Sequence, residues 1–295
     1  MDSPAVDAPW IIATLLILTI LLSSAVLWIR EVQKPKDLMQ NDVGVSAWSI
    51  GWVNFGILIC AIIVATLLFQ SLVFMFVDQP VDPELEIEFT PGIAVLSVLA
   101  TQGPLIAVFF LARRFYPEIY AGRLSRAKLK ASEAFMQALP LFLMFLPVVW
   151  ATSYLWSKLL LTLEKFGVIE EFLPQDIIVL LREENNIPLV IAVVIMAVIV
   201  APIVEELIFR GCLYRFLKSQ TTILLSQILS GMCFALVHFN LMSFVPLLVV
   251  GVLLARVYEK TGSIAVAIWF HAFFNALTIC ILFISSMSDS LSPNY

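Results

Sequence analysis

Charged residues are scarce in this sequence: they make up 13% of the 295 residues, whereas about 25% is typical of soluble globular domains. Hydrophobic residues make up 61%, and the mean hydropathy is +0.99. So few charged side chains cannot cover a folded domain with a water-facing surface, which excludes a soluble globular protein. The net charge of −5 gives no indication of a nucleic-acid partner.

Cysteine is also sparse, and the four cysteines stand singly in or beside hydrophobic runs, without CxxC spacing: Cys60, Cys212, Cys233 and Cys280. This pattern indicates neither a disulfide framework nor a thiolate metal site. Basic residues are absent before the first hydrophobic run, so the basic leader of a secretory signal peptide is lacking. We expect this run to be retained as a membrane span.

Long hydrophobic runs are abundant. About 20 apolar residues in a helix cross a hydrocarbon core of about 30 Å. Such runs predict an all-α polytopic transmembrane helical bundle of about eight spans: Pro9–Ile29, Trp52–Val77, Gly92–Ala112, Phe135–Trp156, Ile187–Leu217, Ile223–His238, Met242–Val257 and Ser263–Met287. The fifth run is longer than a perpendicular span, so we expect it to tilt, to kink near Pro202 or to project beyond the bilayer.

Lysine and arginine are divided unevenly between the predicted loops, and cytoplasmic loops of membrane proteins are rich in both. With the N-terminus outside, all but three of the 17 basic residues fall in cytoplasmic segments; the exceptions are Lys158, Lys165 and Arg182. We therefore expect N- and C-termini outside and basic loops in the cytoplasm. This asymmetry, with no retention or lipidation signal, favours the plasma (inner) membrane of a prokaryote.

Ionisable side chains inside membrane spans are rare because each is costly in hydrocarbon, and in this sequence they gather in the second half. Glu205 and Glu206 are adjacent, and Arg210 follows Glu206 by four residues, on the same helix face. The spacing predicts a Glu206–Arg210 ion pair and leaves Glu205 without a local partner. The alternative is that both acids pair with basic groups near a helix end.

The sequence has only two histidines, His238 and His271, and both lie in predicted spans. Phe234 precedes His238 by four residues, and Asn275 follows His271 by four, so each histidine shares a helix face with its neighbour. Helix tilt and side-chain length allow these residues to meet Glu205 within the membrane. His238 is the least certain member because it stands at the end of its predicted helix.

A carboxylate, two histidines and an amide suit hydrolysis. Glu205 can take a proton from a water molecule that His238 orients, while His271 and Asn275 donate hydrogen bonds to the oxyanion. Alternatively, Glu205, His238 and His271 bind Zn²⁺, because two histidines and one glutamate are a known catalytic zinc set. The HExxH signature is absent. No cofactor is required by the sequence, and Zn²⁺ stays open as an alternative.

Three elements occur in order, each in a hydrophobic helix: Glu205-Glu206-x-x-x-Arg210, Phe234-x-x-x-His238 and His271-x-x-x-Asn275. With them the chain resembles the CPBP family, which comprises the type II CAAX prenyl endopeptidases and the bacteriocin-processing and immunity-associated membrane proteins. The resemblance covers about residues 187–285. It implies that Glu205 and His238 activate water and that His271 and Asn275 stabilise the oxyanion. Glu206, Arg210 and Phe234 then have supporting roles, and the family's metal dependence is itself interpreted both ways.

This interpretation divides the chain into three parts. Residues 1–186 form an N-terminal four-span region ending in an outer amphipathic connector or a plain loop at Ser157–Asn186; residues 187–285 form a catalytic membrane domain; residues 286–295 form a short tail. The predicted function is an intramembrane endopeptidase whose partners are membrane lipid and a peptide or lipidated (prenylated) protein substrate. The rivals are a proton-coupled transporter, a non-catalytic immunity or binding protein, and polar residues that only join helices. The sequence indicates no oligomeric state.

Overall fold

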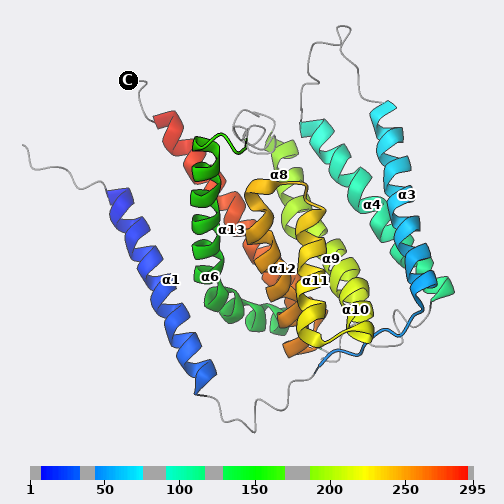
Figure 1. Ribbon diagram of the computed structural model, residues 1–295. Helices are drawn as coiled ribbons and strands as arrows, with labels where there is room; N and C mark the ends of the chain where they lie inside the picture. Colours follow the sequence, from blue (N-terminus) through cyan, green and yellow to red (C-terminus); the bar gives the residue numbers. More distant parts are fainter. Residues whose placement is uncertain (1–7, 34–43, 76–90, 117–128, 170–186, 292–295) are drawn as a thin grey trace, which may run out of the picture.

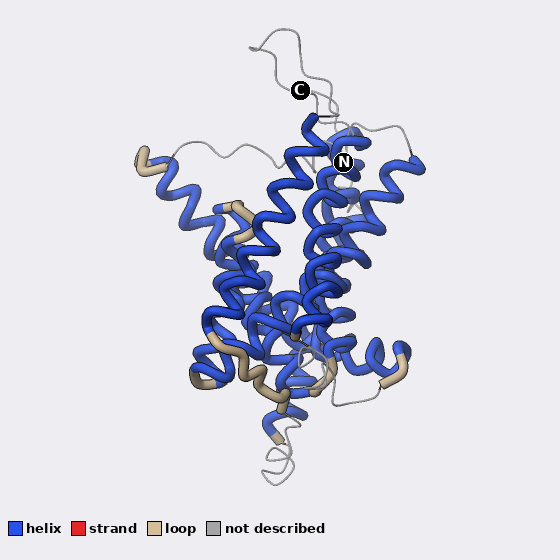
Figure 2. Tube along the Cα trace, turned by 90° about the vertical axis from the view of Figure 1, so that its right-hand side faces the viewer, coloured by secondary structure: helices blue, strands red, loops and turns tan. Residues whose placement is uncertain are grey.

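The computed structural model describes residues 8–33, 44–75, 91–116, 129–169 and 187–291, and these ranges are mostly helical, with no β-strand among them. The helical elements in chain order are α1 (Ala8–Val32), α3 (Trp52–Met75), α4 (Pro91–Phe115), α6 (Ala131–Lys165), α8 (Ile187–Ile195), η1 (Met196–Val200), α9 (Ala201–Glu205), η2 (Glu206–Tyr214), α10 (Arg215–Gln220), α11 (Ile223–Leu236), α12 (Leu241–Thr261) and α13 (Ile264–Leu291). The long helices run roughly side by side in one bundle (Figure 1; Figure 2). The predicted all-α helical bundle is confirmed.

Seven helical segments in the described ranges are long and apolar enough to cross a membrane, as expected of an integral membrane protein. The remaining predicted span, Ile223–His238, forms α11, which has 14 residues and is therefore only about 21 Å long. Helix α11 ends at Leu236 because residues 237–239 form a turn. His238 thus lies just beyond a helix, not inside one.

Helix α6 is longer than the predicted span Phe135–Trp156, because residues up to Lys165 continue it. This stretch is rich in leucine, and Leu160 is buried in the bundle. The predicted connector is therefore wrong for its first part, while residues 170–186 lie outside the described ranges. Helix α13 likewise continues to Leu291, so the predicted tail begins as helix.

The fifth predicted span is one helical run from α8 to α10, in which two π-helical segments flank α9. The first of them, η1, ends just before Pro202. The N–H of Ala201 donates to the carbonyl of Met196, five residues earlier, and Pro202 has no N–H to offer the carbonyl of Ala197. The irregularity predicted near Pro202 is thus a change in hydrogen bonding that leaves one carbonyl of the helix free.

Helices α11 and α12 touch at two glycines, Gly231 and Gly251. A Cβ atom on Gly251 would lie 2.7 Å from the Cα of Gly231, and one on Gly231 would lie 2.8 Å from the backbone nitrogen of Val252. Only glycine allows backbones to approach this closely. The contact also fixes the carbonyl of Gly251, which accepts a hydrogen bond from Arg210 Nη2 at 2.9 Å.

Residues 45–50 join the N-terminal part of the chain to the end of the long helical run. The N–H of Trp48 donates to the carbonyl of Arg215 at 2.9 Å, and the indole is 2% exposed. Lys218 donates to the carbonyl of Val45 at 2.7 Å and forms an ion pair with Glu259 on α12. These contacts hold the ends of α10 and α12 together.

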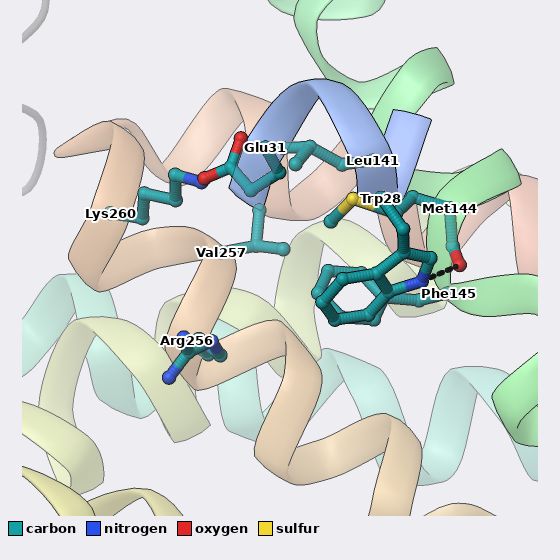
Figure 3. Close-up of a pocket in the computed structure, with 8 residues that line it drawn as sticks. All are labelled: Trp28, Glu31, Leu141, Met144, Phe145, Arg256, Val257 and Lys260. Carbon is teal, nitrogen blue, oxygen red and sulfur yellow. Dashed lines mark hydrogen bonds and ion pairs between the residues drawn. The ribbon is translucent and has the colours of Figure 1, made fainter. Parts of the chain in front are cut away.

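Helix α1 lies at one edge of the bundle, beside α6 (Figure 1). Trp28 Nε1 donates to the carbonyl of Met144 at 3.0 Å, and Glu31 forms an ion pair with Lys260 of α12. These side chains border a small cavity of about 40 Å³ (Figure 3). The cavity shares no lining residue with the acidic cluster described next.

Candidate active site

Glu206 and Arg210 lie on η2 and form the ion pair that their spacing predicts. Arg210 Nη1 is 2.8 Å from Glu206 Oε1, and both side chains are completely buried. Arg210 also lies over the ring of Phe234, 4.7 Å from its centroid. Because arginine stays charged in proteins, Glu206 is a carboxylate with a fixed partner.

The Glu206 carboxylate also holds His271, which α13 brings from the other side. His271 Nδ1 is 3.0 Å from Glu206 Oε1, and the side chain is 4% exposed. Since a carboxylate only accepts hydrogen bonds, Nδ1 carries a proton. The other nitrogen, Nε2, is 3.8 Å from Glu205 Oε2. One glutamate therefore orients the imidazole toward the other glutamate.

Glu205 ends α9 and differs from Glu206 in having no arginine partner within the described ranges. Its Oε1 accepts a hydrogen bond from Gln102 Nε2 of α4 at 3.2 Å. Its Oε2 is buried and has no hydrogen-bond partner among the described residues. The free oxygen faces His271 and is available to a water molecule or a ligand.

Asn275 lies one turn after His271 on α13. Its Nδ2 donates to the carbonyl of Ala197 at 2.8 Å, the same carbonyl that Pro202 leaves without a partner in its own helix. The amide has a second N–H, which this bond does not use. Proline in one helix and asparagine in another together fix the amide beside the cluster.

His238 lies in the turn after α11, and its side chain is exposed. Its Nδ1 is 2.7 Å from the carbonyl of Phe234, so Nδ1 donates, and Nε2 is the nitrogen that has a lone pair when the ring holds one proton. The ring of Phe234 lies 4.8 Å from that of His238 and 5.5 Å from that of His271, between centroids. Phe234 links the two histidines, and no direct bond between His238 and Glu205 appears among the described residues.

The sequence analysis missed the contact of Gln102 with Glu205, because it considered only ionisable residues within the spans. The signal was a polar Thr101-Gln102 pair within the hydrophobic run Gly92–Ala112. Nothing in the sequence pairs this run with Glu205, since the contact depends on how α4 packs against α8 and α9.

The donor geometry gives no three-ligand metal site. Among the described residues, no group of three His, Cys, Asp or Glu side chains could hold a metal ion. His271 Nε2 and Glu205 Oε2 face each other, but the described contacts join His238 to Phe234 and not to Glu205. The proposed set of Glu205, His238 and His271 does not fit a shared ion in this arrangement, and no step below passes through one.

Comparison with known proteins gives a family match for part of the second half of the chain. Residues 187–277 match the family described as "Type II CAAX prenyl endopeptidase Rce1-like". The chain is also 30% identical over 105 residues to the "Putative membrane peptidase YdiL" of Bacillus subtilis (strain 168), a match that covers 33% of this chain and 43% of that protein. The chain thus covers less than half the length of this relative. No solved structure matches the chain significantly.

The matched residues begin with α8 and end within α13, so they include every predicted site residue. Residues 187–277 are therefore similar to the Rce1-like group of type II CAAX prenyl endopeptidases, which supports the resemblance to the CPBP family.

Proposed function

We propose that the chain is an intramembrane endopeptidase that hydrolyses a peptide bond of a membrane-associated protein or peptide. One observation carries the proposal: a partly buried glutamate, whose buried Oε2 accepts no hydrogen bond among the described residues, faces an imidazole that a second, arginine-paired glutamate orients. A base and an oriented imidazole in a site sheltered from bulk water are what hydrolysis of an amide requires. The family match supports the same class of reaction.

Glu205 acts as the base in this proposal. A water molecule has two hydrogens, and two acceptors are suited to them: Oε2 of Glu205, which has no partner among the described residues, and Nε2 of His238. Glu205 takes one proton as the water oxygen attacks the carbonyl carbon. The same proton then passes to the leaving amine as the C–N bond breaks, so Glu205 returns to its starting state.

His271 and Asn275 stabilise the oxyanion in this proposal. Asn275 offers the amide N–H that its bond to Ala197 leaves unused. Because Nδ1 of His271 donates to Glu206, Nε2 can donate to the oxyanion only when the ring carries both protons. Arg210 supports the arrangement by holding Glu206, and Phe234 supports it by contacting both histidines.

An apolar substrate segment suits the surroundings of His238. The turn that carries His238 borders an open cavity of about 430 Å³, lined largely by apolar side chains such as Leu236, Phe239 and Leu241. Such a cavity beside a site within the bilayer favours a membrane-associated or prenylated substrate. Membrane lipid and this substrate are the partners that we propose.

The proposed setting is the plasma membrane of a prokaryote, with both termini outside and basic loops cytoplasmic. Lys218 and Lys260 lie at helix ends that meet at one end of the bundle, through their pairs with Glu259 and Glu31. A basic layer at one end of the bundle is consistent with a cytoplasmic side.

Cleavage by the purified protein tests the proposal. The protein in liposomes is offered prenylated and unmodified peptide libraries, with Glu205→Ala and His271→Ala variants as controls and a chelator in a parallel arm. We expect cleavage by the wild type and none by either variant. Loss of cleavage with chelator, restored by Zn²⁺, would establish the metal alternative. No cleavage of any peptide by folded wild-type protein would instead favour a transporter or a binding protein.

A further inference from the structure

Gln102 lies on α4, outside the residues that the family match covers. Its Nε2 is 3.2 Å from Glu205 Oε1, across 103 positions of sequence. The contact exists because α4 packs against α8 and α9, the start of the long helical run that carries the acids (Figure 1). The N-terminal part of the chain thus reaches the proposed base directly.

The chemistry of the partner sets the orientation of the Gln102 amide. A carboxylate accepts hydrogen bonds, so the amide nitrogen faces Glu205 and the amide oxygen faces away. This oxygen, Oε1, is buried and has no hydrogen-bond partner among the described residues. A buried acceptor without a partner has lost its hydrogen bond to water and gained none in return. Its position therefore suits a donor that arrives with the substrate or the reacting water.

We propose that Gln102 is a positioning residue of the peptidase site, which rests on the function proposed above. Its N–H fixes Oε1 of Glu205, so that Oε2 stays directed at His271 and the attacking water. The last torsion of a glutamate side chain is broad, and without the donor the carboxylate can turn away from this direction. The site is then completed by α4 and is not confined to the residues that the family match covers.

A second polar contact on the same helix provides a matched control. Gln70 Nε2 of α3 donates to Thr101 Oγ1 of α4 at 3.3 Å, on an exposed part of the bundle. This contact joins two helices through the neighbour of Gln102 but does not reach Glu205. Gln70→Leu therefore removes a comparable hydrogen bond while leaving the site intact.

Kinetics of the two leucine variants test the proposal. We expect Gln102→Leu to lower kcat about 10- to 100-fold, because a misplacement of about 1 Å can cost about 100-fold, with KM changed less than about threefold. We expect Gln70→Leu to leave both constants within about twofold of wild type. Gln102→Met, of similar length and without a donor, replaces Gln102→Leu if that variant fails to fold. A kcat within about twofold of wild type for a folded Gln102 variant would overturn the proposal.

A spectroscopic measurement needs no substrate and separates the two proposals. In protein carrying ¹⁵N-labelled glutamine, the side-chain signal of Gln102 is assigned by its loss in Gln102→Leu. We expect Glu205→Ala to shift this signal and to leave that of Gln70 in place. If the signal shifts but the wild type cleaves nothing, the contact stands and the proposed function fails. An unshifted Gln102 signal would overturn the positioning role, whether or not the protein is active.

Discussion

Among the described residues, the buried side chains that carry a charge all belong to the second half of the chain. In α3, the buried side chains are Phe55, Leu58 and Ile62, and most of the rest is exposed and apolar. In η2 and α13, by contrast, the ionisable Glu206, Arg210 and His271 are almost fully enclosed. Charged side chains are costly within a membrane, so the enclosed charges of the second half support the proposed site.

The largest expected effect separates an acid inside the cluster from one outside it. Glu205→Gln removes the proposed base but keeps its shape, so we expect cleavage to fall about 100- to 10,000-fold, the usual contribution of a general base. Glu164→Gln, in the last turn of α6 and outside the cluster, should leave the rate unchanged. Initial rates in liposomes, with folding checked by thermal unfolding, measure both. Equal rates for the two variants would contradict the claim that Glu205 has a catalytic role that Glu164 lacks.

The next effect concerns stability. Arg210→Met leaves the Glu206 carboxylate buried without its cation, and breaking one partner of a buried ion pair costs about 3–5 kcal/mol. Lys158→Met removes a cation that lies 5.6 Å from the Tyr154 ring on α6, and should cost less than about 1 kcal/mol. Thermal unfolding in detergent compares the two. The comparison fails if the lysine variant is the less stable.

A smaller effect distinguishes the glycines of the two halves. Gly251→Ala forces α11 and α12 apart, since its Cβ would lie 2.7 Å from Gly231, and we expect a loss of about 1–3 kcal/mol. Gly56→Ala on α3 meets nothing within 4 Å. It should be neutral or stabilise the protein by up to about 1 kcal/mol, because alanine favours helix. The same unfolding assay measures both variants. Destabilisation by Gly56→Ala but not by Gly251→Ala would contradict the claim that the α11–α12 contact requires glycine.

The smallest effect is expected at α1. Trp28→Phe removes the indole N–H that donates to the carbonyl of Met144, and a single hydrogen bond of this kind is worth about 0.5–1.5 kcal/mol. Cleavage should keep its wild-type rate, because α1 takes no part in the cluster. A large loss of activity without loss of stability would mean that α1 acts on the site.

Short-range patterns made some features predictable from the sequence. Hydrophobic runs located the helices, and a spacing of four residues predicted the Glu206–Arg210 pair that forms. The contact of His271 with Glu206 spans 65 residues, and it depends on how α13 packs against η2. No spacing rule reaches that far.

Other features depended on backbone details that composition does not reveal. Helix α11 ends before His238, and this places the histidine in an exposed turn where a continuous span was predicted. Asn275 finds its partner because Pro202 and the π-helical segment free the carbonyl of Ala197. The roles assigned to Glu205, His238, His271 and Asn275 stay predictions until they are measured.

Hydrolysis in H₂¹⁸O tests the central claim most directly, because it follows the water that Glu205 is proposed to activate. Mass spectrometry of the products reads the new carboxyl group made by wild type and by Glu205→Gln under identical conditions. The account predicts one ¹⁸O atom in the wild-type product and no product above background from the variant. Product formed by Glu205→Gln at the wild-type rate, or wild-type product without ¹⁸O, would contradict it.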